Sequence, residues 1–354
     1  MMKTAVVILN WNTKQYLRRF LPGLLKSLEG LDAGAVVADN ASSDGSVRMM
    51  EEEFPSVRLI PLKENYGFTG GYNRALAEVE AEYFVLLNSD VEVPEGWLEP
   101  LVEWMDSHPE CGACGPKLLR FEERDTFEYA GAAGGLIDRF GYPFCRGRVM
   151  KWYEKDHGQY DKPEDVMWVS GAAMMIRSRL WRELGGLDGR FFAHMEEIDL
   201  CWRLQLEGYR VTTVPSSYIY HIGGGTLPND SPRKLFLNYR NNLLLLDNNA
   251  GKTFALRGMK HPRRKADFLI FKRMVLDGLS GIVYLCSGKW SFFKSVTGAH
   301  KEFRRLRRRP SASEIEAYRG RGYDVRGIYR KWLIPRALIK REKICESLSK
   351  EPVR

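Results

Sequence analysis

Three polar residues, Asn88-Ser89-Asp90, directly follow the apolar run Tyr83–Leu87. The run predicts a buried parallel strand, because it is continuous, apolar and rich in β-forming residues. Ligands of open α/β sheets bind at the carboxyl ends of such strands. Side-chain oxygens there suit a hard divalent cation, which in turn suits a diphosphate. Taken alone, the tripeptide is better explained as a turn before Pro94, so other segments must decide.

Three further segments place polar or glycine residues where a predicted strand ends. They are Val6–Asn12, Val36–Gly45 and Asn65–Asn73. Asp39, in the second segment, could accept hydrogen bonds from a base or a ribose. The glycines of the third would let a phosphate approach the backbone at a helix N-terminus, although their spacing fits neither a dinucleotide fingerprint nor a Walker loop. Turn chemistry explains each segment by itself, but not why all of them meet at one edge of the sheet.

Three acids, Glu196, Glu197 and Asp199, lie within four residues at the start of a helical apolar pattern. Carboxylates this close raise one another's pKa, which suits one of them to act as a general base. Two structural explanations compete with this one. Acids are favoured at a helix N-terminus, and Asp199 is four residues from Arg203, a spacing at which the two pair on a helix.

His221 ends an apolar and aromatic run, and Gly223, Gly224 and Gly225 come shortly after it. A histidine after a strand is usually structural. Near a metal–diphosphate site, however, its imidazole is a candidate ligand.

The elements that would position these residues alternate along the first half of the chain. Strands are predicted at 4–10, 35–39, 57–62 and 83–87, and helices at 13–31, 43–54, 70–79 and 94–107. Ser42 or Ser43 is the predicted N-cap of the second helix. This order predicts an α/β fold with a doubly wound sheet and right-handed crossovers. Farther on, the sequence predicts irregular structure over 111–168, strands at 169–177 and 211–215, and helices at 179–184, 197–208 and from 238 onward.

Taken together, the motifs resemble those of family-2 glycosyltransferases. They are V-x-I-L-N-W-N, D-N-A-S-S-D-G-S, N-Y-G-F-x-G-G-Y-N-R-A, L-L-N-S-D-V, S-G-A-A-M-M-I-R and E-E-I-D-L-C-W-R. The resemblance covers about residues 3–245 and points to the rhamnosyltransferase-like branch of bacterial surface-polysaccharide synthesis. It implies a GT-A fold with a mostly parallel, Rossmann-like sheet, a nucleotide-diphosphate sugar as donor, Mn²⁺ or Mg²⁺, and inversion at the anomeric carbon. The Q-x-x-R-W motif of processive synthases is absent, which implies transfer of one sugar to a saccharide or lipid-linked acceptor.

The resemblance also implies roles for individual residues. The donor would be bordered by Asn10, Asn12, Asp39, Gly67, Phe68, Asn73, Asn88 and Ser89, with Asp39 at the base. The metal would be bound by His221 and by Asp90, the last residue of a D-x-D-like motif whose first position is Asn88. The general base would be Glu197, at the second acid of the family's E-D motif. Because Asp is usual there, the choice stays open among Glu196, Glu197 and Asp199.

One C-terminal segment carries the basic character of the chain. The whole chain of 354 residues has a formal charge of +9, whereas Arg257–Arg309 holds fifteen Lys or Arg against three acids. Apolar residues recur there at three- and four-residue steps, at Phe268, Phe271, Val275, Leu279, Ile282 and Leu285. The segment is either a packed helical appendage with a solvated basic face or an interfacial helix on an anionic membrane. The resemblance favours the membrane, because many acceptors of the family are lipid-linked.

These observations predict a GT-A domain over 1–245 and a helical, basic extension over 246–354. No apolar stretch reaches the ~18–20 residues of a transmembrane helix, no signal peptide is expected, and the six cysteines show no framework spacing. The protein is therefore expected in the cytoplasm, peripheral on the inner face of the membrane. Its expected partners are the donor, the acceptor and an anionic membrane surface, and not nucleic acid.

Two rival functions make different demands on the sequence. A sugar-nucleotide pyrophosphorylase should show a glycine-rich, basic phosphate loop after the first strand, and Asn10-Trp11-Asn12 contains no glycine. A nucleic-acid-binding protein that uses the basic segment should bind in a strongly salt-dependent way and have no need of Asp90.

Overall fold

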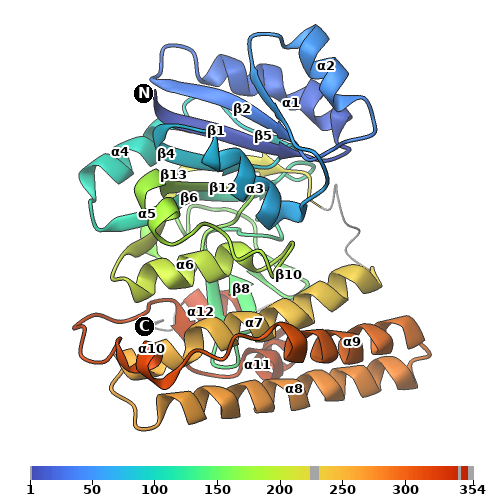
Figure 1. The fold of residues 1–354 in the computed structure, drawn as a ribbon, viewed down its shortest axis with the longest axis vertical. Coiled ribbons are helices and arrows are strands. Elements are labelled where there is room, and N and C mark those ends of the chain that lie inside the picture. Colours follow the sequence, from blue (N-terminus) through green and yellow to red (C-terminus); the bar gives the residue numbers. More distant parts are fainter. Residues whose placement is uncertain (1, 224–230, 342–343, 350–354) are drawn as a thin grey trace.

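The computed structural model describes residues 2–223, 231–341 and 344–349, and Figure 1 shows their arrangement. Gly224 and Gly225, which were noted after His221, lie outside the described residues. The central sheet has the order β11-β13-β6-β12-β4-β1-β2-β3, and β5 pairs with β13 beside this path. Its strands are β1 Met2–Asn10, β2 Ala33–Asp39, β3 Arg58–Pro61, β4 Ala81–Leu87, β5 Val91–Glu92, β6 Cys111–Arg120, β11 Glu164–Asp165, β12 Ala173–Arg177 and β13 Arg210–His221.

The first half of the chain forms the predicted α/β, doubly wound arrangement. Strands β3, β2, β1 and β4 are parallel. Alternate residues of β1 belong to two hydrophobic clusters on opposite faces, Val6 to one and Val7 to the other. The first cluster includes residues of α1 Lys14–Ser27, α2 Ser46–Glu53 and α4 Glu99–Ser107, and the second includes residues of α3 Gly67–Ala77, α5 Ser178–Glu183 and α6 Glu196–Leu206.

The cap predicted for α2 is wrong. The helix begins after Gly45, which has a φ of 81° and serves as its N-cap. Ser42 and Ser43 instead tie the turn after β1 to the turn after β2. The Asn12 backbone N–H donates to Ser42 Oγ over 2.9 Å, and the Ser43 N–H donates to Asn12 Oδ1 over 2.7 Å. The two turns therefore hold each other at the sheet edge.

The irregular structure predicted over 111–168 is wrong for its first ten residues. Cys111–Arg120 forms β6, a strand of the central sheet that is buried along almost its whole length. Glycine and proline have low β-propensity, so the sequence of this segment does not predict a strand. Small residues are required because neighbouring side chains leave no room for larger ones. A Cβ on Gly112 would lie 2.9 Å from Tyr209 Cβ, and one on Gly115 would lie 3.0 Å from Val169 Cβ. Close packing therefore selects small residues here.

Beyond β6, short strands form a second sheet in the order β10-β9-β8-β7-β14. They are β7 Gly135–Asp138, β8 Pro143–Cys145, β9 Arg148–Val149, β10 Trp152–Tyr153 and β14 Ile328–Tyr329. The prediction of loops and short strands holds for this region. Since β14 comes from the C-terminal part of the chain and pairs with β7, the middle and the C-terminal part of the sequence share this sheet.

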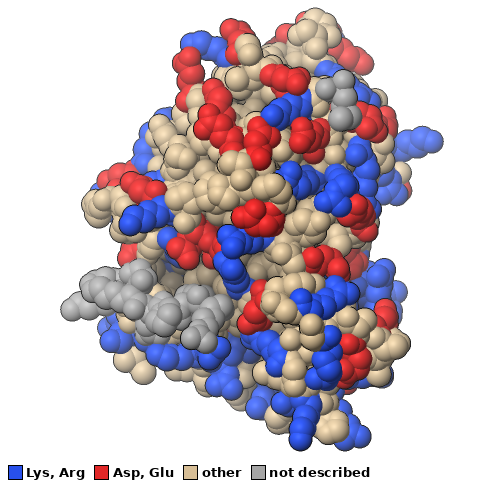
Figure 2. Space-filling view, turned by 90° about the vertical axis from the view of Figure 1, so that its left-hand side faces the viewer, with Lys and Arg blue, Asp and Glu red and all other residues tan. Residues whose placement is uncertain are grey.

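The helices after β13 are α7 Pro232–Leu256, α8 Pro262–Cys286, α9 Trp290–Leu306, α10 Ala312–Glu316, α11 Leu333–Lys340 and α12 Ile344–Ser349. In Figure 1 the long helices α7, α8 and α9 lie below the central sheet. Figure 2 shows Lys and Arg side chains gathered along the lower part of the face that it presents. The division into 1–245 and 246–354 stays a prediction, and its boundary falls inside α7.

Candidate active site

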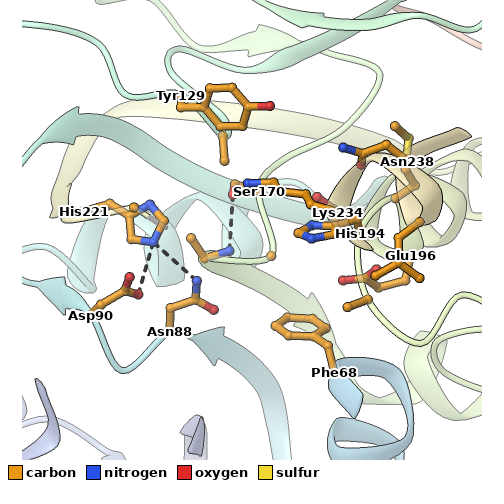
Figure 3. Close-up of a pocket in the computed structure, with 18 of the residues that line it drawn as sticks. Phe68, Asn88, Asp90, Tyr129, Ser170, His194, Glu196, His221, Lys234 and Asn238 are labelled. Atoms are coloured by element: carbon orange, nitrogen blue, oxygen red, sulfur yellow. Dashed lines mark hydrogen bonds and ion pairs between the residues drawn. The ribbon is translucent and has the colours of Figure 1, made fainter. Parts of the chain in front are cut away.

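A cavity of about 610 Å³ opens at the carboxyl ends of β4 and β13, and Figure 3 shows part of its wall. The first turns of α3, α6 and α7 complete the wall. Many of the residues predicted for the site meet here, from segments far apart in the sequence. Those that line the cavity are Gly67, Phe68, Asn88, Ser89, Asp90, Glu196, Glu197 and His221.

Asp90 and His221 face each other on one side of the cavity (Figure 3). Strand pairing brings them together, because β5 runs antiparallel to β13 with Val91 opposite His221. His221 Nε2 lies 3.1 Å from Asp90 Oδ1 and 3.4 Å from Asn88 Nδ2. On the far side of the ring, Nδ1 lies 3.4 Å from Glu128 Oε1. The imidazole is thus held between two carboxylates.

The electrostatics of this group follow from burial and charge. Burial disfavours the imidazolium, but Asp90 and Glu128 outweigh this effect and raise the pKa of His221 to about 10. Burial likewise works against ionised Glu128, and the charge of His221 still holds the pKa of that carboxyl below its ordinary value.

The Asp90–His221 pair fits a divalent cation. A bound cation would displace the Nε2 proton, and Glu128 would hold the remaining ring proton at Nδ1, as an outer carboxylate does for many metal-binding histidines. The Nε2 lone pair and the Asp90 carboxylate could then both bind the cation. Within the described residues no three or more His, Cys, Asp or Glu form a group that could hold a metal by itself. The remaining ligands would be phosphate oxygens and water, as is common for Mg²⁺.

Glu196 and Glu197 open α6 on another side of the cavity, and Figure 3 labels the first of them. The Oε2 atoms of both side chains are buried and have no hydrogen-bond partner within the described residues. Burial raises the pKa of Glu197 to about 7. Burial, and next the charge of Glu197, raises the pKa of Glu196 well above its ordinary value. Unpartnered carboxyl oxygens of this kind at a cavity wall can accept a proton near neutral pH.

Asp199, the third acid of the cluster, differs from the other two. Its side chain is fully buried, and Arg203 Nε donates to its Oδ2 over 2.7 Å. Its other oxygen accepts from Asn248 Nδ2 and Asn249 Nδ2 over 2.9 and 2.8 Å. The structural alternative for this residue, the i,i+4 pair, is therefore formed, and Asp199 does not line the cavity.

The polar residues after β1 and β2 lie behind the cavity wall. Asn10 Nδ2 donates to Asp39 Oδ2 over 2.7 Å, and the Ser42 N–H donates to Asp39 Oδ1 over 2.8 Å. Asn10 and Asp39 are buried, whereas their neighbours Trp11 and Asn40 reach the cavity. Neither Asn10, Asp39 nor Asn12 is in its wall, so their contacts with a nucleotide stay predictions.

Two residues of the glycine-rich segment, Gly67 and Asn73, have structural contacts, and their predicted places beside the donor stay predictions. A Cβ on Gly67 would lie 2.5 Å from the ring of Phe192, so the absence of a side chain here leaves room for that ring. Gly67 also has a φ of 69°, a left-handed conformation that glycine adopts without steric cost. Asn73 lies away from the cavity wall. Its Nδ2 donates to the Leu187 carbonyl over 2.7 Å, and its Oδ1 accepts from the Leu187 N–H over 2.9 Å.

The loop before Glu196 contains a feature that sequence patterns do not reveal. Phe192, His194 and Met195 have φ values of 64°, 72° and 72°, a left-handed conformation that costs side-chain-bearing residues free energy. Asn241, fully buried on α7, compensates for this. Its Nδ2 lies within hydrogen-bonding distance of the carbonyls of Phe191, Ala193 and His194, at 3.0, 2.8 and 2.7 Å, and shares its two N–H bonds among them.

Sequence reasoning missed several other residues of the site. Glu128 stands in a stretch without a clear pattern, and Asn241 lies in a helix, where an asparagine gives no signal. Residues of the cavity wall that were not predicted include Tyr129, Arg148, Ser170, His194, Lys234 and Asn238. Burial, aided by the charge of Lys234, lowers the pKa of His194 to about 4, so this imidazole is neutral at pH 7.

A carboxylate–imidazole pair at a sheet edge, with two acids in the same cavity, is consistent with a group-transfer enzyme of the α/β class. Residues 5–184 match the model of glycosyl transferase family 2, and the chain belongs to this family. It is 27% identical over 257 residues to N-acetylglucosaminyl-diphospho-decaprenol L-rhamnosyltransferase of Mycobacterium tuberculosis, covering 68% of this chain and 83% of that protein. It is also 27% identical over 165 residues to the rhamnosyltransferase WbbL of Escherichia coli, covering 44% and 61%.

Solved structures confirm the GT-A type of fold. The mannosyltransferase PcManGT of Pyrobaculum calidifontis, solved with GDP-Man and Mn²⁺, superposes with a TM-score of 0.50 at 16% identity and covers 98% of this chain and 83% of its own. GalNAc-T7, solved with UDP, GalNAc and Mn²⁺, gives a TM-score of 0.53 at 17% identity over 72% of this chain. The match spans about half of that protein, 51%.

Because the pKa of Glu197 is raised, we expect its ionisation to destabilise the fold as pH rises. The pKa of Glu197 rises from 4.5 to about 7 on folding, so the folded protein holds this proton more tightly than the unfolded chain. The contribution of Glu197 to stability therefore falls as pH rises from 4.5 to 7 and stays unfavourable above. Glu197→Gln removes this charge and relieves Glu196, and should stabilise the fold by roughly 1–3 kcal/mol at pH 8 and not at pH 4.

Urea unfolding at pH 4, 6 and 8 measures this effect. Glu95→Gln, which changes an exposed glutamate, should leave the stability unaltered at each pH. Equal stability of the wild type and Glu197→Gln at pH 8 would show that the carboxyl is not held in a desolvated position.

Asn241→Ala is expected to lower kcat for sugar transfer more than it changes KM for the donor. The substitution removes three hydrogen bonds from the left-handed loop that leads into Glu196, and so loosens the acids without touching the Asp90–His221 side. Asn249→Ala on the same helix is the matched control. It removes bonds to Asp199 and to the Leu245 carbonyl, and should lower the melting temperature comparably while kcat stays near that of the wild type. Equal kcat losses in both variants would reduce the role of Asn241 to general stability.

Proposed function

We propose that the protein is an inverting glycosyltransferase that moves one sugar from a nucleotide-diphosphate sugar to a hydroxyl of a saccharide or lipid-linked acceptor in cell-surface polysaccharide synthesis. One observation carries the proposal. A single cavity joins the Asp90–His221 pair, which fits a cation and its diphosphate, to the unpartnered acids Glu196 and Glu197. Donor and acceptor chemistry can therefore take place in one enclosed volume.

Glu197 is the proposed general base. With a pKa of about 7, it is ionised in a large fraction of molecules at neutral pH and still basic enough to take a proton from an acceptor hydroxyl. That oxygen would form its bond to the anomeric carbon as the bond to the diphosphate breaks, so a single displacement inverts the configuration. A bound Mn²⁺ or Mg²⁺ would neutralise charge on the departing diphosphate. Asp90 and His221 would hold the cation, and Asn88 and Ser89 would border the donor.

The nature of the acceptor is supported by the relatives. The Mycobacterium tuberculosis protein is named for a diphosphate-linked lipid carrier, and a comparable lipid-linked acceptor is proposed here. Transfer of one sugar is supported by the absence of the Q-x-x-R-W motif from the sequence. The pyrophosphorylase alternative is disfavoured, because the turn after β1 has no glycine-rich phosphate loop and the chain belongs to glycosyl transferase family 2.

The experiment that tests the proposed function separates the two sides of the cavity. The purified protein is supplied with Mn²⁺, a panel of nucleotide sugars and a diphosphate-linked lipid acceptor, and transfer is followed by mass spectrometry. Asp90→Ala should weaken binding of the donor and abolish transfer, and EDTA should abolish transfer by the wild type. Glu197→Gln should lower kcat by ~100-fold or more while donor binding persists.

The exposed control Glu95→Gln should keep wild-type rates. Full activity in EDTA would refute the metal-dependent version. An active Glu197→Gln would move the base to Glu196.

The surface of α8 supports a peripheral position on an anionic membrane. Five apolar side chains that recur at helical spacing are 47–60% exposed, namely Phe268, Phe271, Val275, Leu279 and Ile282. Arg264, Lys265 and Lys272 are also exposed and stand on the same side of the helix by their spacing. An apolar stripe flanked by cations suits the interface of a bilayer better than nucleic acid. Among the described helices, none is long and apolar enough to cross a membrane.

Flotation with liposomes tests the membrane contact. The protein should float with vesicles that contain anionic lipid at low salt, and should be released by high salt because the attraction is partly electrostatic. Phe271→Ser combined with Leu279→Ser should weaken flotation at every salt concentration. Leu338→Ser, which changes an apolar residue of α11 that is 64% exposed, is the control and should float normally. Failure of the wild type to float with anionic vesicles at low salt would leave α8 as a packed appendage.

A further inference from the structure

The cavity contains a second polar group, which the mechanism above does not use. Arg148 on β9 and Tyr129 line it together, and the guanidinium carbon of Arg148 lies 3.9 Å from the centroid of the Tyr129 ring. The Nε atom of Arg148 is buried and has no hydrogen-bond partner within the described residues. A buried guanidinium donor without an acceptor is costly, and its presence at a cavity wall points to a ligand that supplies the acceptor.

Two other arginines near the cavity, Arg120 and Arg124, form ion pairs with glutamates. Arg120 Nη1 lies 2.9 Å from Glu123 Oε2, and Arg124 Nη2 lies 2.7 Å from Glu92 Oε1. Among the described residues Arg148 makes no comparable ion pair, and its partner is the face of an aromatic ring. Stacking of this kind orients the guanidinium plane and leaves its N–H edge for a planar or tetrahedral anion.

This group lies away from the residue proposed to border the nucleotide. In Figure 3, Tyr129 and Phe68 lie on opposite sides of the cavity, and Phe68 is the residue proposed to border the nucleotide. Two further residues of the wall extend the group. Tyr153 is 40% exposed, and the guanidinium carbons of Arg148 and Arg120 lie 6.0 and 5.5 Å from its ring centroid. Tyr129, Arg148, Tyr153 and Arg120 therefore form a continuous aromatic and cationic strip in the cavity wall.

We propose that Arg148, stacked on Tyr129, binds a phosphate group of the acceptor, next to the sugar that receives the transferred unit. This inference rests on the proposed function. The cation at Asp90 and His221 would satisfy the donor diphosphate, so a second cationic centre in the same cavity calls for a second anion. A sugar attached through phosphate to a lipid carries that anion beside its hydroxyls. The bidentate geometry of arginine suits a phosphate, and Tyr153 offers a ring on which the first part of the carrier can lie.

Binding without turnover tests the proposal. The whole protein is saturated with Mn²⁺ and a nucleoside diphosphate, which fills the donor side, and is titrated calorimetrically with three probes. They are N-acetylglucosamine linked to an undecyl chain through diphosphate, N-acetylglucosamine 1-phosphate, and the uncharged undecyl glycoside. The wild type should bind both charged probes more tightly than the uncharged one. Tighter binding of the lipid-linked probe than of the free sugar phosphate identifies the carrier as part of the ligand, and equal binding identifies the phosphate alone.

Arg148→Gln should weaken both charged probes by about 10- to 100-fold and leave the uncharged probe unaffected. Arg148→Lys keeps the positive charge but lacks the bidentate guanidinium, and its affinity for the charged probes should lie between those of the wild type and Arg148→Gln. Arg139→Gln is the matched control, because Arg139 is exposed, lies over the ring of Phe140 with its guanidinium carbon 5.3 Å from the centroid, and is outside the cavity wall. It should bind all probes as the wild type does. Melting curves establish that each variant is folded.

Other outcomes overturn the inference. If the wild type does not prefer the charged probes, or if Arg148→Gln binds them normally, the site is absent. If Arg148→Gln loses affinity for the nucleoside diphosphate and not for the probes, Arg148 belongs to the donor. The transfer assay fails or succeeds independently of these results. If Arg148→Gln transfers sugar with an unaltered KM for the acceptor, the phosphate subsite is refuted and the proposed function stands. If the probes bind in an Arg148-dependent way but the wild type transfers no sugar, the subsite stands and the proposed function is refuted.

Discussion

The register between β5 and β13 is the constraint on which the site depends. It places Val91 opposite His221, so that the residue before β5, Asp90, meets the imidazole at 3.1 Å. A shift by one residue would turn His221 to the other face of the strand and separate it from both Asp90 and Glu128. The register of β13 is also fixed from its other side, because β13 pairs along most of its length with the buried strand β6. The geometry of the Asp90–His221 side of the cavity is therefore set by strand pairing in the core of the sheet.

The acid side is held by a different means and at a cost. Two carboxyls that each have one buried oxygen without a hydrogen-bond partner within the described residues, and a left-handed loop, are each unfavourable, and functional sites concentrate such features. The structure compensates from α7, where one asparagine satisfies three loop carbonyls and Arg240 NH2 donates to the Phe191 carbonyl over 2.7 Å. The loop before Glu196 and Glu197 is therefore held by α7, which sequence patterns assign only to a generic helical region.

The sequence predicts those parts of the site that obey local rules. Strand-to-turn transitions reveal Asp90 and His221, and an acid cluster at a helix start reveals Glu196 and Glu197. Local rules fail where tertiary contact decides. Glu128 matters only because β13 brings His221 to it, and Arg148 only because a short strand lays it on Tyr129. The same limit hides β6, whose small residues are required by side chains distant in the sequence, and it hides the contact of Gly67 with Phe192.

The helices after β13 connect the cavity to the surface below it. Helix α7 lines the cavity with Lys234 and Asn238, and its Asn242 accepts from Arg273 of α8. Arg273 also pairs with Asp277 over 2.8 Å, and both side chains are buried. A buried pair of this kind contributes little net stability, but any rotation of α8 would expose or unpair it. The pair therefore keeps Arg273 and Asp277 inward and the Phe268–Ile282 stripe outward. A membrane that takes up this stripe would receive the enzyme in one orientation, with the cavity at a set height above the lipid-linked acceptor.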